Sequence, residues 1–353
     1  RTCNSVFNQT MFTVILLTVL LSIVVWFCLN PMLRVLHADG DVAVFFKDYY
    51  GIMLVQLPVM VINSSYGMFI RGEGKPQYFM QVNILNVLLN IFLDYLFVRW
   101  FGWGVKGIAL ASLLAGAVTL VCILYFFLKK STVYKLGRFE FSRMVCKDTL
   151  LNGSSEFIGE ISLSISMFAY NFVILRNIGI EGVTAFTIVG YIAFIFSMVT
   201  IGFGQGASSL ISFTYGAGER GLTKEVRRIT NIMVLGAGAA VMLFVLGGSE
   251  WYGSLFVKND TVVQMVRSGA GIYAFSFLFS GINVINSFYF TSIGRAMESA
   301  VISSSRGLVL LLIFIFILPP FLGMTGVWLV APLTEVLTLF LGLFFIRKAD
   351  SGA

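Results

Sequence analysis

The stretch "RGEGKPQYFMQVNILNVLLNIFLDYLF" (71–97) joins a short basic turn to an apolar run that is long enough to cross a bilayer. A helix of about 20 apolar residues spans the hydrocarbon core of a membrane. Similar runs recur along the whole chain, and we predict one crossing helix for each of them: 11–29, 48–70, 77–98, 105–128, 151–175, 183–210, 229–248, 268–292, 299–318 and 326–346. The chain is therefore predicted to be an all-α polytopic membrane protein.

The composition agrees with this class. Hydrophobic residues make up 58% of the 353 residues and charged residues only 12%, whereas soluble domains are about 25% charged. The four cysteines show no C-x-x-C spacing and the chain has one histidine, so we expect no metal centre, no cofactor and no histidine-based catalysis.

The net charge of +7 has a membrane explanation. If the predicted helices alternate in direction from an inner N-terminus, most Lys and Arg residues fall on the inner side, including those of "KKSTVYKLGRFEFSRMVCK" (129–147). Cytoplasmic loops carry such an excess in membrane proteins. We therefore expect a multi-pass protein of the plasma (inner) membrane with both termini cytoplasmic, and no nucleic-acid partner.

The chain also contains an internal repeat. A shift of 220 residues aligns residues of the same type in the same order, including Gly51 with Gly271, Asn63 with Asn283, and the turn Gly74-Lys75 with Gly294-Arg295. A shift of 219 residues then aligns Gly107 with Gly326. Such self-similarity indicates two structurally related halves.

The repeat predicts the domain organisation. Residues 1–128 form an N-lobe of four helices, 129–147 a basic cytoplasmic linker, 148–348 a C-lobe of six helices, and 349–353 a C-terminal tail. The first two C-lobe helices have no counterpart, so we expect roughly 75 residues with two more helices to precede residue 1. The complete lobes would be parallel, pseudo-symmetric six-helix repeats.

Two polar stripes interrupt the apolar helices. Asn152, Glu156 and Glu160 recur every four positions and so share one helix face. A carboxylate near the bilayer centre costs about 2.5–3.5 kcal/mol on insertion scales. The function of such a carboxylate, which a proton or a cation can neutralise, would explain why the chain keeps it despite this cost. We predict a coupling-ion or substrate site here. Hydrogen bonding between helices is the structural alternative.

The second stripe lies on 81–97, where Asn83, Asn86, Asn90 and Asp94 share one face. Asn83 and Asn86 fit interhelical hydrogen bonding, but Asp94 adds an ionisable group, so Asn90 and Asp94 are candidate ligands with Asn63 as their partner. Arg306 and Glu335, in the last two predicted helices, are expected to form a structural ion pair.

These residues resemble the multidrug and toxic compound extrusion (MATE) transporters, most closely the bacterial MepA-like branch. The segments that carry the resemblance are 71–97, "NGSSEFIGEIS" (152–162) and "GFGQGASSLISFTYGAGE" (202–219). The resemblance covers the whole chain from the family's third helix onward. It implies a V-shaped pair of six-helix lobes that work by alternating access and export organic cations or drugs in exchange for H⁺ or Na⁺.

The resemblance also implies roles for individual residues. Glu160 matches a carboxylate of the family's seventh helix, Asn90 and Asp94 match ligands of its fifth, and Asn63 and Ser112 fall near the remaining N-lobe ligands. No acidic residue occurs within 268–292, which disfavours a C-lobe Na⁺ site and leaves H⁺, or Na⁺ near Asp94. A monomer is expected.

Three other readings stay open. A lipid-linked oligosaccharide flippase of the same superfamily would line its cavity with Arg and Lys to hold a pyrophosphate, whereas the intramembrane charges here are mostly acidic. An intramembrane enzyme would need a clustered His, Cys or carboxylate set, which the sequence lacks. A purely structural protein would not need a repeated bundle with inward polar stripes.

Overall fold

The computed structural model describes residues 2–35 and 40–351, and these ranges are helical apart from short turns and the segment 131–142. Contacts divide the chain into two compact units, Arg1–Thr149 and Leu150–Ala353. The predicted all-α architecture is confirmed. The last two residues of the predicted tail lie outside the described residues, and the preceding ones continue the last helix.

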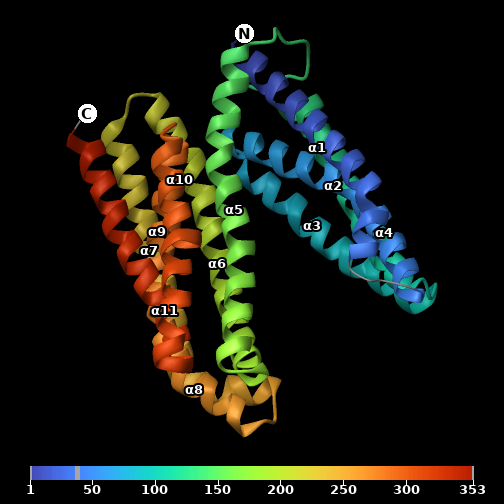
Figure 1. Cartoon of the computed structure of the whole chain (residues 1–353). Coiled ribbons are helices and arrows are strands. Elements are labelled where there is room, and N and C mark those ends of the chain that lie inside the picture. Colours follow the sequence, from blue (N-terminus) through green and yellow to red (C-terminus); the bar gives the residue numbers. More distant parts are fainter. Residues whose placement is uncertain (1, 36–39, 352–353) are drawn as a thin grey trace. The chain divides into compact units, whose positions relative to one another are not determined.

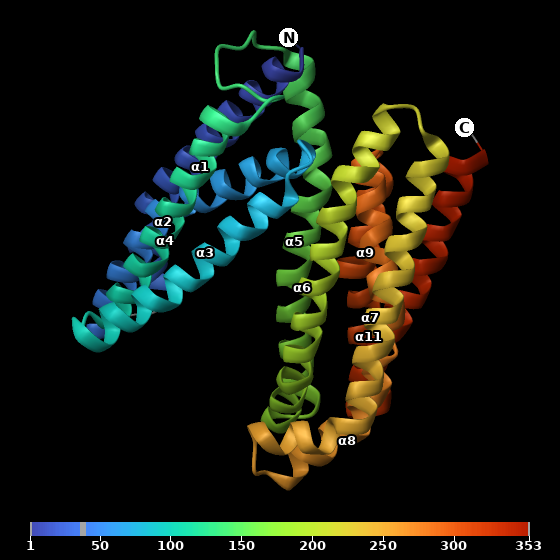
Figure 2. The same ribbon diagram turned by 180° about the vertical axis from the view of Figure 1, so that it is seen from behind.

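The first unit packs four long helices against one another. α2 lies between α1 and α4, and α3 packs on α4 (Figures 1 and 2). One end of this bundle is filled by aromatic side chains around Phe7, which is fully buried. The elements are α1 (Thr2–Val35), α2 (Asp41–Gly72), α3 (Pro76–Tyr95) with the π-helical turn Leu96–Trp100, and α4 (Gly104–Tyr125) with the π-helical turn Phe126–Lys130.

The second unit is a larger bundle. α9 contacts α6, α7, α10 and α11, and Trp328, which is 1% exposed, lies in its main core cluster. The elements are α5 (Arg143–Asn177), α6 (Ile180–Gly216), α7 (Arg220–Phe256), α8 (Asp260–Ala274), α9 (Ser276–Ser292), α10 (Ala296–Ser304), the π-helical segment Ser305–Val309, and α11 (Leu310–Ser351).

One predicted crossing is broken. We expected a single helix over 268–292, but α8 and α9 meet at Phe275 with a bend of 45°. The amides of Phe275 and Leu278 bond three residues back, to Ile272 and Phe275. This tight 3₁₀-type bonding interrupts the regular helical ladder. Within the described residues, eight helices are long and apolar enough to cross a membrane, or nine when this bent pair counts as one.

The last crossings form a hairpin. Arg306 and Glu335 are 29 positions apart, yet Arg306 Nη2 lies 2.7 Å from Glu335 Oε1, whereas a straight helix would separate them by about 44 Å. The chain therefore reverses, and the reversal falls at Gly323, whose φ of 56° leaves the helical region. Glycine adopts positive φ without steric cost. The runs 299–318 and 326–346 are thus two arms, drawn from orange to red in Figure 1.

Gly269→Ala tests the packing at Trp328. A Cβ added at Gly269 would lie 1.7 Å from Trp328 Nε1, and the indole is too deeply buried to move away. We expect the free energy of unfolding to fall by about 1–3 kcal/mol, the usual cost of overpacking. Gly236→Ala is the matched control, because a Cβ there meets nothing within 4 Å. Equal thermal stability of the two variants in detergent would contradict this packing.

The linker segment 131–142 is bound along the first unit. In α1, Asn8 donates to the carbonyl of Lys135 at 2.9 Å and accepts from Gly137 at 3.0 Å, and Gln9 makes a similar pair of bonds with Ser142. Glu73, in the turn after α2, accepts hydrogen bonds from the Ser131 hydroxyl and from the amides of Thr132 and Val133. The linker has no helix or strand to pair its backbone groups, and side chains of the first unit form hydrogen bonds with several of them instead.

Glu73→Gln should loosen this attachment. Partial burial raises the pKa of Glu73, but its hydrogen bonds outweigh that effect and the net pKa lies below the ordinary value of 4.5. Because the folded pKa is depressed, the stabilisation is complete above pH 4.5 and is lost as the pH falls through the folded value. We expect the variant to lose about 0.5–1 kcal/mol at pH 7, since the group is partly exposed.

Thermal unfolding of both proteins as a function of pH measures this effect, and the difference between them should shrink under acid conditions. Glu140→Gln is the control, because Glu140 is exposed on the same segment. A difference between parent and Glu73→Gln that stays constant from pH 7 to acid would contradict the role of the Glu73 charge.

Candidate functional site

The polar stripe of α3 meets α4 in the first unit. Asn90 Nδ2 donates to Ser112 Oγ at 3.1 Å, so two of the predicted ligands are in direct contact. Asp94 lies one turn further along α3, and its Oδ1 is shielded and accepts no hydrogen bond from the described residues. A shielded carboxylate oxygen without a donor is suited to bind a proton or a cation.

Asn63 differs from the expectation. We predicted it as a partner of Asn90 and Asp94, but its Nδ2 donates to the backbone carbonyl of Gly116 at 2.9 Å. Its Oδ1 is buried and has no partner among the described residues. Asn63 therefore holds α2 on α4 through its amide nitrogen and leaves one oxygen acceptor.

In the second unit, two of the three polar residues of the α5 stripe contact α9 and the third does not. Glu156 Oε1 accepts a hydrogen bond from the Thr291 hydroxyl at 3.2 Å, and Asn152 Nδ2 donates to the Thr291 carbonyl at 3.4 Å. Glu160, one turn further, is exposed and makes no hydrogen bond or ion pair with any side chain in the part of the chain that the structure describes. The structure thus brings Asn152 and Glu156 to α9 and leaves Glu160 on the surface of its unit.

A chain of hydroxyl groups continues from Glu156 into the bundle. Thr291 Oγ1 lies 2.8 Å from Ser299 Oγ, which lies 2.8 Å from Ser287 Oγ, which in turn lies 2.9 Å from Ser303 Oγ. We did not predict these residues. Their signal in the sequence is a spacing of four on each helix, Ser287–Thr291 and Ser299–Ser303, which puts each pair on one helix face.

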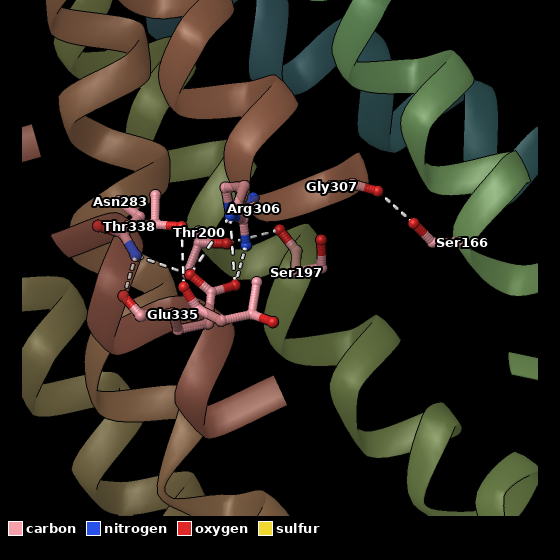
Figure 3. Close-up of polar contacts among 9 residues, drawn as sticks. Ser166, Ser197, Thr200, Asn283, Arg306, Gly307, Glu335 and Thr338 are labelled. Carbon is pink, nitrogen blue, oxygen red and sulfur yellow. Dashed lines mark hydrogen bonds and ion pairs between the residues drawn. The ribbon is translucent and has the colours of Figure 1, made fainter. Parts of the chain in front are cut away.

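Arg306, Glu335 and Asn283 form a second polar cluster. Arg306 contacts the Glu335 carboxylate through Nε and Nη2 at 3.2 and 2.7 Å. Asn283, which is fully buried, donates from Nδ2 to Glu335 Oε2 at 2.7 Å and to the Glu335 carbonyl at 2.8 Å. Figure 3 shows Arg306 and Asn283 both directed at this carboxylate. The side chains of Arg306 and Glu335 are 27% and 11% exposed.

Local structure presents Arg306 to this cluster. Arg306 lies in the π-helical segment Ser305–Val309, and the carbonyl of Gly307 next to it accepts a hydrogen bond from Ser166 of α5 (Figure 3). π-Helical turns widen the backbone and leave carbonyls to be satisfied from outside, and they are frequent at functional sites.

The two units make the same hydrogen bond at equivalent positions of the repeat. Asn63 bonds the carbonyl of Gly116 in the first unit, and Asn283 bonds the carbonyl of Glu335 in the second. Asn63 and Asn283 are 220 positions apart, and Gly116 and Glu335 are 219 apart, as the aligned sequences require. The internal repeat is thus visible as a repeated contact between equivalent helices.

Apart from the Arg306 guanidinium, the polar groups brought together are carboxylates, hydroxyls and amides. No group of three or more His, Cys, Asp or Glu side chains that would hold a metal occurs among the described residues. Carboxylate, hydroxyl and amide oxygens are hard ligands, which suit protons and hard cations such as Na⁺. The arrangement therefore fits reversible binding of such an ion better than transition-metal chemistry.

Comparison with known proteins gives the family. The family model MatE matches residues 1–96 and 157–317. The chain is 20% identical to the multidrug export protein MepA of Staphylococcus haemolyticus over 90% of the chain and 70% of that protein. It is 22% identical to the multidrug and toxin extrusion protein 1 of Homo sapiens over 71% of the chain, which corresponds to 44% of that protein.

The solved structures agree on the fold. An outward-facing multidrug resistance MATE family transporter of the MOP superfamily superimposes with a TM-score of 0.93 at 24% identity, covering 99% of this chain and 79% of the other. The family model matches well over half of the residues, and the apolar helices are those of a multi-pass membrane protein. The chain belongs to the MATE family of transporters, whose members are not enzymes.

Proposed function

We propose that the protein is a secondary active efflux transporter that exports organic cations in exchange for H⁺ or Na⁺ by alternating access. One observation carries the proposal: each unit places a carboxylate on an otherwise apolar helix next to hydroxyl or amide groups, with half-buried Asp94 one turn from Asn90 on α3 and Glu156 of α5 bonded by Thr291. A coupling ion and a cationic substrate that compete for such a carboxylate lower each other's affinity, which is the thermodynamic basis of exchange.

The relatives support the substrate class. MepA is a multidrug export protein and the human relative a multidrug and toxin extrusion protein, so we infer varied organic compounds as substrates. The 14 methionines and the 15% of aromatic residues provide polarisable surface for such molecules through cation–π and dispersion contacts.

We also propose that the protein acts as a monomer in the plasma membrane with cytoplasmic termini. The distribution of Lys and Arg supports this orientation. The linker 129–147 carries much of that charge and would lie on the inner side.

The flippase alternative is less well supported. A pyrophosphate site needs free cationic side chains, whereas Arg306, a basic residue within the membrane-spanning part of the second unit, is neutralised by Glu335.

The test is transport by the purified protein in proteoliposomes. Uptake of a fluorescent organic cation is followed under an imposed pH gradient, then under an imposed Na⁺ gradient, with collapsed gradients as the control. Uptake driven by either gradient supports exchange and identifies the coupling ion. Uptake that is the same with and without both gradients would overturn the antiport proposal.

A further inference from the structure

The two units carry different residues at equivalent positions of the internal repeat. In the first unit the residue bonded by Asn63 is Gly116, which has no side chain, and the aligned position of Arg306 is Asn86. The first unit instead has Asn90, Asp94 and Ser112, for which the second unit has Leu310, Phe314 and Ala331. Each unit thus has a carboxylate on these aligned helices, and among the described residues a basic side chain bonds Glu335 of the second unit but none bonds Asp94 of the first.

Glu335 is fully engaged by its neighbours. Both of its carboxylate oxygens are bonded, Oε1 by Arg306 and Oε2 by Asn283 and Arg306. A buried carboxylate requires a counter-charge, and the guanidinium supplies it at hydrogen-bonding distance. A free cation cannot approach the same oxygens while the guanidinium is there, because both positive charges would occupy one small volume of low dielectric.

We propose that Arg306 is a tethered cation that permanently fills the cation position of the second unit at Glu335. Among the described residues of the first unit no basic side chain pairs with Asp94, so a free H⁺ or Na⁺ must neutralise that carboxylate. The inference deepens the proposed function and rests on it in one respect: it assigns the mobile coupling cation to Asp94 of the first unit and not to Glu335. Arg306 is thereby the residue that keeps monovalent cations away from Glu335.

The oxygens for a free cation are present once the guanidinium is removed. Asn283 Oδ1 and the hydroxyl of Thr334 are buried and have no partner among the described residues. Asn283 bonds Glu335 through its amide nitrogen, and Thr334 precedes Glu335 in the chain. Amide, hydroxyl and carboxylate oxygens are ligands of the kind that hard cations such as Na⁺ accept. Arg306→Gln is therefore expected to turn this position into a Na⁺ site.

The experiment measures thermal stability in detergent, in NaCl and in choline chloride of equal ionic strength. All variants carry Asp94→Asn, which removes the response of the first unit. With Arg306→Gln added, we expect a lower melting temperature in choline and a saturable rise of about 3–6 °C in NaCl. Arg306→Lys is the matched control, because its ammonium still fills the position, and it should show no Na⁺ response.

The proposal requires that the rise of the melting temperature in NaCl depends on Glu335. Adding Glu335→Gln to Arg306→Gln should abolish the rise, and this separates Glu335 from the other carboxylates of the unit, such as Glu156 and Glu160. A rise that survives Glu335→Gln, a rise in the Arg306→Lys protein, or no rise in a folded Arg306→Gln protein would each overturn the proposal.

A second measurement keeps Arg306 in place and is made on protein whose folding is checked by circular dichroism. Binding of ²²Na⁺ to the Asp94→Asn protein with Arg306 intact should be unchanged when Glu335→Gln is added. Binding that disappears with Glu335→Gln would show a free ion at Glu335 and overturn the proposal. Neither measurement involves transport, so a protein that fails to exchange organic cations can still pass both, and the two proposals fail separately.

Discussion

Asp94→Asn is expected to reduce gradient-driven transport about 5- to 150-fold, the range that corresponds to a coupling free energy of about 1–3 kcal/mol. Asp94 is the ionisable residue of the α3 stripe, and its shielded Oδ1 has no donor among the described residues. An amide has nearly the same shape, but it neither takes up a proton at physiological pH nor neutralises a cation. Binding of the coupling ion should therefore be lost while the fold is kept.

The measurement is uptake of a fluorescent organic cation into proteoliposomes under pH and Na⁺ gradients. Asn83→Ala is the control, because Asn83 is an exposed member of the same stripe and should transport like the parent. Glu160→Gln, measured alongside, asks whether the second unit also contributes. Full transport by both the Asp94→Asn and Glu160→Gln proteins would reduce the two stripes to interhelical hydrogen-bonding residues.

Arg306→Met should destabilise the protein by about 3–5 kcal/mol, since it leaves the Glu335 carboxylate buried without its counter-charge. Glu335 is 8% exposed, and Arg306 joins it across the Gly323 hairpin. The loss should therefore be seen in the free energy of unfolding in mixed detergent micelles. Replacement of both partners, Arg306→Met with Glu335→Leu, should restore most of it, because an apolar pair of similar volume needs no counter-charge.

Lys106→Met provides the comparison with an exposed pair. Lys106 and Asp48 are 3.9 Å apart and their side chains are 55% and 45% exposed, so their pairing is worth at most about 1 kcal/mol. Equal destabilisation by Lys106→Met and Arg306→Met would contradict the assignment of Glu335 as a buried charge that depends on its partner.

Much of the fold was predictable because membrane helices are long and uniform. The apolar runs gave the crossing helices, and the low charge content gave the class. The break at Phe275 was not predictable, since the run 268–292 contains no proline and the bend arises from local 3₁₀-type bonding. The attachment of the linker was also hidden, because Glu73 bonds residues 58 to 60 positions away in the chain.

The candidate sites were predictable as far as helix periodicity reaches. Spacing placed Asn90 next to Asp94 and Asn152 next to Glu156 on single faces, but it cannot tell which neighbouring helix each face meets. Asn63 bonds a backbone carbonyl, which no side-chain pattern reveals. The hydroxyl chain from Thr291 to Ser303 was missed because serine and threonine are common in membrane helices, where they also bond their own backbone.

The ion pair between Arg306 and Glu335 also has an electrical consequence. Its two charges are opposite and lie 2.7 Å apart, so a membrane voltage does almost no net work on the pair when the bundle moves. An unpaired charge that crosses the field gains or loses about 2.3 kcal/mol per 100 mV. The voltage dependence of the transport cycle should therefore arise from carboxylates without a bound arginine, such as Asp94, and from the ions that they carry.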